Sequence, residues 1–253
     1  MKKLLVLTAA IIGLGLLPAF AQFGPRSGGP RFDGAMNKLF GANQAFSANV
    51  EFQISGGNGG DNITMPSKVN FDAGKTRFEM NMSEMKGSKM PANIMDHMKS
   101  MGMDTIISIA RPDLKLTYVV YPGLNSYAEM AGQDPTAGAS LDDFKVETTE
   151  LGKETVEGHD CVKNKVTVTD KDGAKHESTV WNATDLKQFP IKIVTTDNGP
   201  ASTILFKDVT FTKPAANLFE APAGFTKYTD VQVMMQTEMA KKMGNMGMAP
   251  QHQ

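Results

Sequence analysis

The part of this sequence that could do chemistry most directly is rich in methionine. Residues 90–103 read MPANIMDHMKSMGM, and five of these fourteen residues are methionine. Met95, Met98 and Met101 follow at intervals of three, so in a helix they share one side. Thioethers with a nearby imidazole, here His97, suit Cu(I). Unbranched methionines can equally form an apolar surface that adapts to varied ligands, or they can fill a core.

A second candidate for chemistry is the run His159-Asp160-Cys161, which holds the only cysteine of the chain. On a strand, His159 and Cys161 point the same way, and the valines that follow have the opposite parity. We therefore expect Cys161 on the wetter face, as an inert thiol. A nucleophilic cysteine needs a base within reach, and no motif supplies one.

Motifs of the common enzyme classes are absent from the sequence. It contains no G-x-S-x-G, no H-E-x-x-H, no C-x-x-C and no phosphate-binding glycine loop. The carboxylates are scattered through expected turns and wet strand faces, so a hydrolase with paired carboxylates is not supported. We predict a protein that is not an enzyme, with no catalytic residue, no assigned metal ligand and no cofactor.

The first residues are typical of a secretory signal peptide. Lys2 and Lys3 form a basic start, residues 4–17 are apolar, and Ala19 and Ala21 are small residues of the kind that signal peptidase requires. The apolar run is shorter than the roughly 20 residues of a bilayer span. We predict cleavage after Ala21 and export to the periplasm.

The charge balance excludes one class of partner. The chain has 26 basic and 27 acidic residues, and without Lys2 and Lys3 its net charge falls from −1 to −3. Such a balance does not attract nucleic acid or anionic membranes. No later apolar segment is long enough to span a bilayer, so we expect that this chain is not an integral membrane protein. A single cysteine also means no internal disulfide.

Most of the remaining chain alternates between apolar and polar residues. The residues 46–55, FSANVEFQIS, show the pattern first, and it recurs in roughly ten short segments. Such alternation is typical of strands with one buried and one wet face. Residues 170–173, DKDG, predict a tight hairpin, and a parity shift predicts a bulge at Lys207-Asp208. Together these features predict one large antiparallel sheet, twisted or closed partly into a barrel.

Helices must cover the buried face of this sheet. Pro91 fits the first turn of a helix and Gly102 fits the position just past its end. The apolar side of this short helix carries methionine, and Met80 and Met82 of the preceding strand would continue the same lining. The predicted ligand-binding residues are Met80, Met82, Ile94, Met95, Met98 and Met101.

Two further helices are expected. Residues 32–46 can hold a short one with Met36, Leu39 and Phe40 on one side. The other follows a capping-box pattern at Thr229 and Gln232. Its apolar stripe consists of Val231, Met234, Met235 and Met239.

The order of these features resembles a known group of proteins. The motifs are VWNATDLKQFPIKI (residues 180–193) and the closing phrase FKDVTFTKPAANLFEAPAGF (residues 206–225). They resemble the LolA/LolB-like superfamily of periplasmic lipoprotein carriers. The stretch from RFEMNMSEM through YPGLNSYAEM is similar more specifically to an uncharacterised bacterial secreted family with that fold. The resemblance covers about residues 45–228.

The resemblance implies a fold and a function. The fold is mainly β (α+β), a large antiparallel sheet curved into an unclosed half-barrel. Short helices, including the methionine-rich one, cover its concave face, which shelters acyl chains in the carriers. We expect a signal peptide (1–21), a flexible leader with a short helix (22–44), the half-barrel (45–228), and a C-terminal helix and tail (229–253).

The predicted function is non-enzymatic binding of a hydrophobic ligand, a lipid or a lipoprotein acyl chain, by an exported protein. Two alternatives remain open. One is a Cu(I)-binding or copper-stress protein that uses the methionine-rich helix. The other is a structural or sensor domain that binds a partner protein.

Overall fold

The computed structural model describes residues 34–55, 62–87, 91–131, 144–195 and 201–245. The chain divides into two units, residues 1–31 and 32–253, and all described residues belong to the second. The predicted signal peptide, most of the predicted leader, residues 132–143 and the tail beyond residue 245 lie outside the described residues.

The described residues form one sheet of twelve strands. In chain order these are β1 (Ala45–Ile54), β2 (Ile63–Asp72), β3 (Lys75–Asn81), β4 (Thr105–Arg111), β5 (Leu116–Tyr121), β6 (Ser126–Ala131), β7 (Lys145–Val156), β8 (His159–Thr169), β9 (Lys175–Ala183), β10 (Phe189–Thr195), β11 (Ser202–Thr210) and β12 (Thr226–Tyr228). Their order across the sheet is β12-β6-β5-β4-β3-β2-β1-β11-β10-β9-β8-β7.

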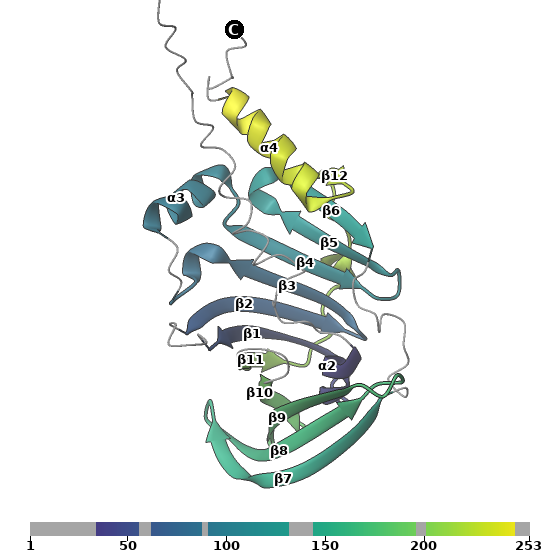
Figure 1. Cartoon of the computed structure of the whole chain (residues 1–253). Helices are drawn as coiled ribbons and strands as arrows, with labels where there is room; N and C mark the ends of the chain where they lie inside the picture. The colour runs from purple at the N-terminus through teal and green to yellow at the C-terminus, as the bar shows by residue number, and fades with distance from the viewer. Residues whose placement is uncertain (1–33, 56–61, 88–90, 132–143, 196–200, 246–253) are drawn as a thin grey trace, which may run out of the picture. The chain divides into compact units, whose positions relative to one another are not determined.

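Two meanders build this sheet. Strands β1 to β6 form one and β7 to β11 form the other, and antiparallel pairing of β1 with β11 joins them. Strand β12 then pairs in parallel with β6. Because β12 and β7 lie at opposite ends of the order, the curved sheet stays open (Figure 1). The prediction of an unclosed half-barrel is confirmed.

The bulge predicted in the last long strand is present. Asn49 pairs with Lys207 and Ser47 pairs with Thr210, so β11 has one residue more than β1 between these pairs. Asp208 lies at this point with a positive φ of 52°. Its carboxylate accepts a hydrogen bond of 2.8 Å from the side-chain amide of Asn49. An Asp tolerates the left-handed region better than most residues do, and this contact holds it there.

Phenylalanine rings fill the middle of the concave face. Helix α2 (Gly34–Leu39) confirms the predicted short helix, and Phe40 directly after it is only 1% exposed. The ring centroid of Phe40 lies 4.8 Å from that of Phe46, 5.1 Å from Phe71 and 5.8 Å from Phe189. Each ring buried in this way contributes about 1.5–3 kcal/mol to stability. This part of the sheet is occupied by the protein's own side chains.

Two more helices lie at the β5–β6 end of the same face. They are α3 (Ala92–Met101) and α4 (Val231–Asn245). Residues paired directly across neighbouring strands point to the same face of a sheet. Phe78 of the aromatic core pairs with Ser108, and Ser108 pairs with Val119, which packs under α4. The aromatic core and α4 are therefore on the same face. None of the helices that the structure describes is long and apolar enough to cross a membrane.

The other face of β4–β6 is covered by the closing segment, residues 211–225. It contains a short 3-10 helix, Ala216–Phe219, whose Phe219 is 1% exposed. Phe219 packs in a cluster with Ile107, Ile109, Tyr118, Val120 and Tyr127. The end of the motif FKDVTFTKPAANLFEAPAGF therefore forms this second layer.

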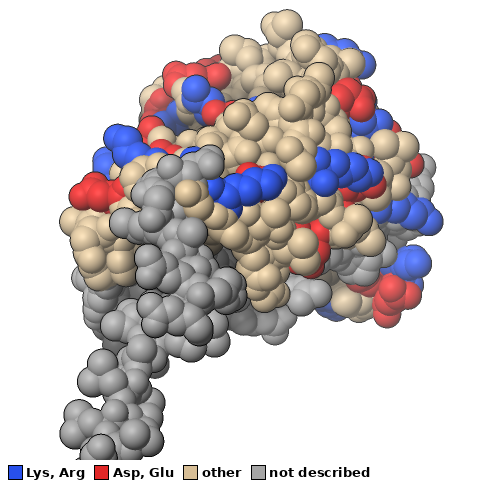
Figure 2. Space-filling view, turned by 90° about the horizontal axis from the view of Figure 1, so that it is seen from above, with Lys and Arg blue, Asp and Glu red and all other residues tan. Residues whose placement is uncertain are grey.

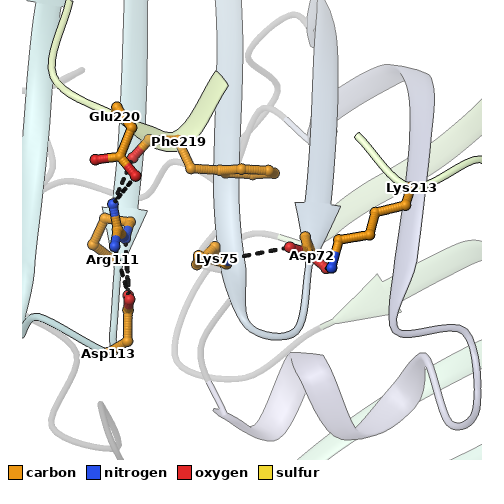
Figure 3. A network of polar contacts seen from close by, with 7 residues as sticks. All are labelled: Asp72, Lys75, Arg111, Asp113, Lys213, Phe219 and Glu220. Carbon is orange, nitrogen blue, oxygen red and sulfur yellow. Dashed lines mark hydrogen bonds and ion pairs between the residues drawn. The ribbon is translucent and has the colours of Figure 1, made fainter. Parts of the chain in front are cut away.

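Polar contacts fasten the closing segment (Figure 3). The guanidinium of Arg111 donates to Asp113 and to Glu220, both at 2.8 Å, and to the carbonyl of Phe219 at 3.2 Å. Asp72 forms ion pairs with Lys75 at 3.0 Å and with Lys213 at 3.4 Å.

Candidate functional site

The candidate site is a cluster of methionine side chains between the sheet and helices α3 and α4. At least six of the 18 methionines of the chain meet there. We call this group the methionine cluster, and its methionines are Met101, Met103, Met130, Met234, Met235 and Met239. Ile106, Val119, Tyr121, Leu124, Ala128, Tyr228 and Val231 complete the apolar surroundings.

Helix α4 supplies three of these methionines through its spacing. Met235 and Met239 are four residues apart and Met234 lies beside them, so all three face the sheet. The helix is capped by Asp230, whose carboxylate accepts from the amides of Gln232 at 2.7 Å and Val233 at 3.1 Å. The prediction of Thr229 as the cap was wrong by one residue, because the helix begins at Val231 and Asp230 is the residue directly before it.

The end of α3 brings in two more methionines. The helix begins at Ala92, with Pro91 just before it rather than in its first turn. It ends at Gly102 in the left-handed conformation, φ 73°, as the sequence predicted. The amide of Met103 donates to the carbonyl of Met98 at 2.9 Å. The chain reverses at this cap, and Met101 and Met103 are both 2% exposed within the cluster.

Two glycines allow α3 to approach the sheet. A Cβ atom added to Gly102 would lie 2.6 Å from the carbonyl oxygen of Gly123 in the turn after β5. Lys242 of α4 donates to the carbonyl groups of both Met101 and Gly123. The end of α3, the turn after β5 and the end of α4 therefore meet at one point.

A buried carboxylate holds the side of α4 next to β6. Glu238 is 8% exposed and accepts hydrogen bonds from the hydroxyl of Tyr228 at 2.5 Å and the ammonium of Lys241 at 2.7 Å. Burial alone would raise the pKa of Glu238, but the contacts with Lys241 and Tyr228 outweigh it and hold that pKa below its ordinary value. Glu238 is therefore ionised at neutral pH and fixes the rotation of α4.

The interior of the cluster is strongly apolar. Burial raises the pKa of the Tyr121 hydroxyl to about 12, as expected where a phenolate would lose its hydration. Methionine side chains have three rotatable bonds and a polarizable sulfur. The arrangement can therefore change shape around an apolar guest.

The structure brings only one predicted site residue into the cluster, Met101. Met98 is 2% exposed and Met82 is 3% exposed, so both are buried, but neither packs in the methionine cluster. Met80 packs against the aromatic core instead. Ile94 and Met95 are half-buried on α3.

The site has residues that the sequence reasoning missed. Met234, Met235 and Met239 were recognised as an apolar stripe but were not assigned to the site. Met103 and Met130 were not singled out at all. The only signal in the sequence was that all of these residues are methionines. Nothing local in the sequence indicates that α4 lies next to β6.

Cys161 is not on the wet face, and that prediction was wrong. It is 2% exposed and pairs across the ladder with Ala183, which is fully buried. The turn after Ala183 folds back over this strand end, where Thr184 donates to the carbonyl of Asp160 at 2.9 Å. Cys161 packs with Ala183 in the aromatic core, whereas Asp160 beside it is exposed. Burial also raises the pKa of the Cys161 thiol, so it is a poor nucleophile at neutral pH.

Two other features are weaker candidates for a site. A groove of about 270 Å³ crosses β1, β2, β3 and β11, and polar side chains such as Glu51, Glu79 and Lys207 line it. It offers little to an apolar chain. Among the described residues, no three His, Cys, Asp or Glu side chains group as a metal site. His97 points to solvent while Met98 and Met101 are buried, so the copper alternative gains no support.

Three solved structures to which this chain is similar are distant in sequence. A LolA superfamily protein from Nitrosomonas europaea is 11% identical, with 74% of this chain and 94% of that chain covered and a TM-score of 0.38. The lipoprotein LppX from Mycobacterium tuberculosis is 10% identical, with 70% and 91% covered and a TM-score of 0.38. LprF from Mycobacterium bovis is 13% identical, with 72% and 96% covered and a TM-score of 0.36. These likenesses say nothing about what this chain binds.

The sequence itself matches a family model. No curated protein matches it significantly. Residues 58–189, more than half of the chain, match the model described as a domain of unknown function, DUF4412. This match confirms the resemblance to an uncharacterised family. The chain is a member of the DUF4412 family.

Proposed function

We propose that this protein is a non-enzymatic, exported binding protein that takes up a hydrophobic ligand, a lipid or a lipoprotein acyl chain, at the methionine cluster. The observation that carries the proposal is the convergence of six methionines from α3, β6 and α4 and the segment between α3 and β4 on one apolar site. The site residues predicted from the sequence remain part of this proposal. Ile94, Met95, Met98 and Met101 lie on α3, and Met80 and Met82 lie in the chain before that helix. A periplasmic location is proposed with it.

The methionine cluster is a better place for a ligand than the aromatic core. The core rings of Phe46, Phe71 and Phe206 are fully buried, and the centroid of Phe46 lies 5.2 Å from that of Phe71 and 6.1 Å from that of Phe206. Rigid rings cannot move aside without leaving a cavity. Methionines can adopt other rotamers at small cost, so space for a guest opens more readily under α4.

Helix α4 would act as the movable cover. It lies at one end of the sheet (Figure 1), and its contacts are the methionines and a few polar groups. Seen from above, this end of the molecule shows a broad area of residues other than Lys, Arg, Asp and Glu, with basic and acidic side chains among and around it (Figure 2). Each ligand methylene that leaves water contributes about 0.8 kcal/mol. An acyl chain could therefore offset the displacement of three methionine side chains.

Two neighbouring residues of α4 provide a matched test. Met234 is fully buried in the cluster, whereas Val233 is 52% exposed on the other side of the helix. We expect the purified full chain to bind a fluorescent fatty acid, and Met234→Glu to weaken this binding at least tenfold. Val233→Glu should bind like the wild type. Native mass spectrometry of freshly isolated protein should show bound lipid.

Two results would overturn the proposal. One is the absence of both co-purified lipid and fatty-acid uptake in the wild type. The other is equal binding by Met234→Glu and Val233→Glu, provided that both variants keep the circular dichroism of the sheet. Capture of a specific protein partner without any lipid would favour the sensor-domain alternative.

A further inference from the structure

The six methionines of the cluster differ in their access to solvent. Met101 and Met103 are 2% exposed, Met234 is fully buried and Met235 is 7% exposed. Met130 on β6 and Met239 on α4 are half-buried at the margin of the same cluster. The cluster thus has two partly exposed methionines and four buried ones.

Accessible thioethers react with peroxides and hypohalous acids. A peroxide transfers one oxygen atom to the sulfur, its O–O bond breaks, and water leaves. The sulfur loses two electrons, the oxidant gains them, and the protein supplies no group to the reaction. The product, a sulfoxide, is polar and needs a hydrogen-bond donor when it is buried.

We infer that the methionine cluster is an oxidant-sensitive modification site, in which Met130 and Met239 react first and their oxidation releases α4 from the sheet. A sulfoxide on Met239 would place a polar oxygen against the apolar surface that α4 covers. The remaining apolar contacts of α4, through Met234 and Met235, then open to solvent and become oxidisable in turn. The inference uses the same cluster as the proposed function but does not depend on any ligand.

The geometry gives the oxidation a fixed order. Met234 and Met235 are protected only while α4 is docked, because the helix itself shields them from solvent. Their oxidation should therefore follow that of Met239 and accelerate once Met239 has reacted. If the methionines reacted independently, the oxidation rate of Met234 and Met235 would not depend on whether Met239 had already reacted.

The test uses the full chain without added ligand and dilute hydrogen peroxide. Peptide mass spectrometry follows each methionine, and hydrogen exchange follows the backbone amides of residues 231–242. In the wild type, we expect Met130 and Met239 to be oxidised first, amide exchange in α4 to rise at least tenfold, and Met234 and Met235 to follow. A methionine sulfoxide reductase should restore the slow exchange.

Three variants separate this inference from a general effect of oxidation. In Met130→Leu/Met239→Leu, oxidation of Met234 and Met235 should slow at least fivefold, and α4 should stay docked. Leucine has nearly the volume of methionine, so this variant should fold. The control is Met85→Leu, which removes a half-buried methionine that packs against the aromatic core outside the methionine cluster. Its Met234, Met235 and α4 amides should behave as in the wild type.

The third variant, Met239→Gln, imitates the polarity of the sulfoxide and should raise amide exchange in α4 without any oxidant. The inference fails if Met234 and Met235 are oxidised at the same rate in the wild type and the double variant. It also fails if α4 exchanges as slowly after complete oxidation of Met130 and Met239 as before. Fatty-acid binding is measured without oxidant, so failure of the proposed function would be seen separately.

Discussion

The side chain of Lys242 in α4 donates a hydrogen bond of 2.7 Å to the carbonyl oxygen of Met101, which lies 141 residues earlier in the chain. The same ammonium group reaches the carbonyl of Gly123 at 3.3 Å. Met101 is the last residue of α3, where carbonyl groups have no partner within the helix. A cation also suits this end of a helix dipole. One side chain thus connects α3, α4 and the turn after β5 around the methionine cluster.

Lys242→Met should weaken this connection while keeping the length of the side chain. We expect a loss of about 1 kcal/mol in the free energy of unfolding, the usual net value of one such hydrogen bond. The amides of α4 should exchange faster, since the helix loses one of its anchors. Urea unfolding and hydrogen exchange would check both. Lys171→Met, at an exposed hairpin turn, is the control and should change neither; equal behaviour of the two variants would contradict the role of Lys242.

Gly102→Ala should reveal how tightly α3 packs on the turn after β5. Gly102 has a φ of 73°, and its added Cβ would lie 2.6 Å from the oxygen of Gly123. Gly173 has a similar φ of 83° but open space around it. Gly173→Ala should therefore cost about 1 kcal/mol of stability for the backbone conformation alone. Gly102→Ala should cost at least about 2 kcal/mol, because overpacking adds to that strain. Thermal unfolding would compare them, and equal losses would argue against the close contact.

Local periodicity predicted most of the fold. Strand β1 was predicted because Val50 and Phe52 face the core while Glu51 does not, and this alternation holds wherever one face of a strand is buried. The bulge at Asp208 was predicted for the same reason, since an extra residue shifts the parity. The stripe of α4 was equally visible from its spacing. All of these features depend on neighbours within a few residues.

The composition of the site could not be predicted in the same way. Met101 and Met234 meet only because β12 pairs with β6 and so carries α4 over the end of the sheet. Periodicity shows which side of a helix is apolar but not which distant segment covers it. The error at Cys161 has a related cause, since local parity does not show that this strand end packs beside Ala183 in the aromatic core.

Phe219→Ala should show how much the closing segment contributes to stability. Phe219 is 1% exposed in the cluster that covers the outer face of β4–β6. Truncation of a buried phenylalanine typically costs about 3–5 kcal/mol, and we expect a loss in this range by urea unfolding. Leu114→Ala is the control, because Leu114 is 48% exposed in a turn and should change stability by less than about 0.5 kcal/mol. A small effect of Phe219→Ala would mean that the segment is only loosely attached.

Glu238→Gln should make the free energy of unfolding less dependent on pH in the acidic range. The pKa of Glu238 is held below its ordinary value in the folded chain, because contacts with Lys241 and Tyr228 outweigh burial. A carboxyl group whose pKa is lower folded than unfolded stabilises the fold above the unfolded pKa of about 4.3. That contribution disappears as pH falls through the lower, folded pKa. The wild type should therefore be more stable than Glu238→Gln at pH 7, and the difference should shrink below about pH 4.

Urea unfolding of both proteins between pH 7 and pH 2 would measure this difference in stability. Exchange of the α4 amides should change over the same interval, and a difference in stability that stays constant across this range would show that ionised Glu238 does not hold the helix.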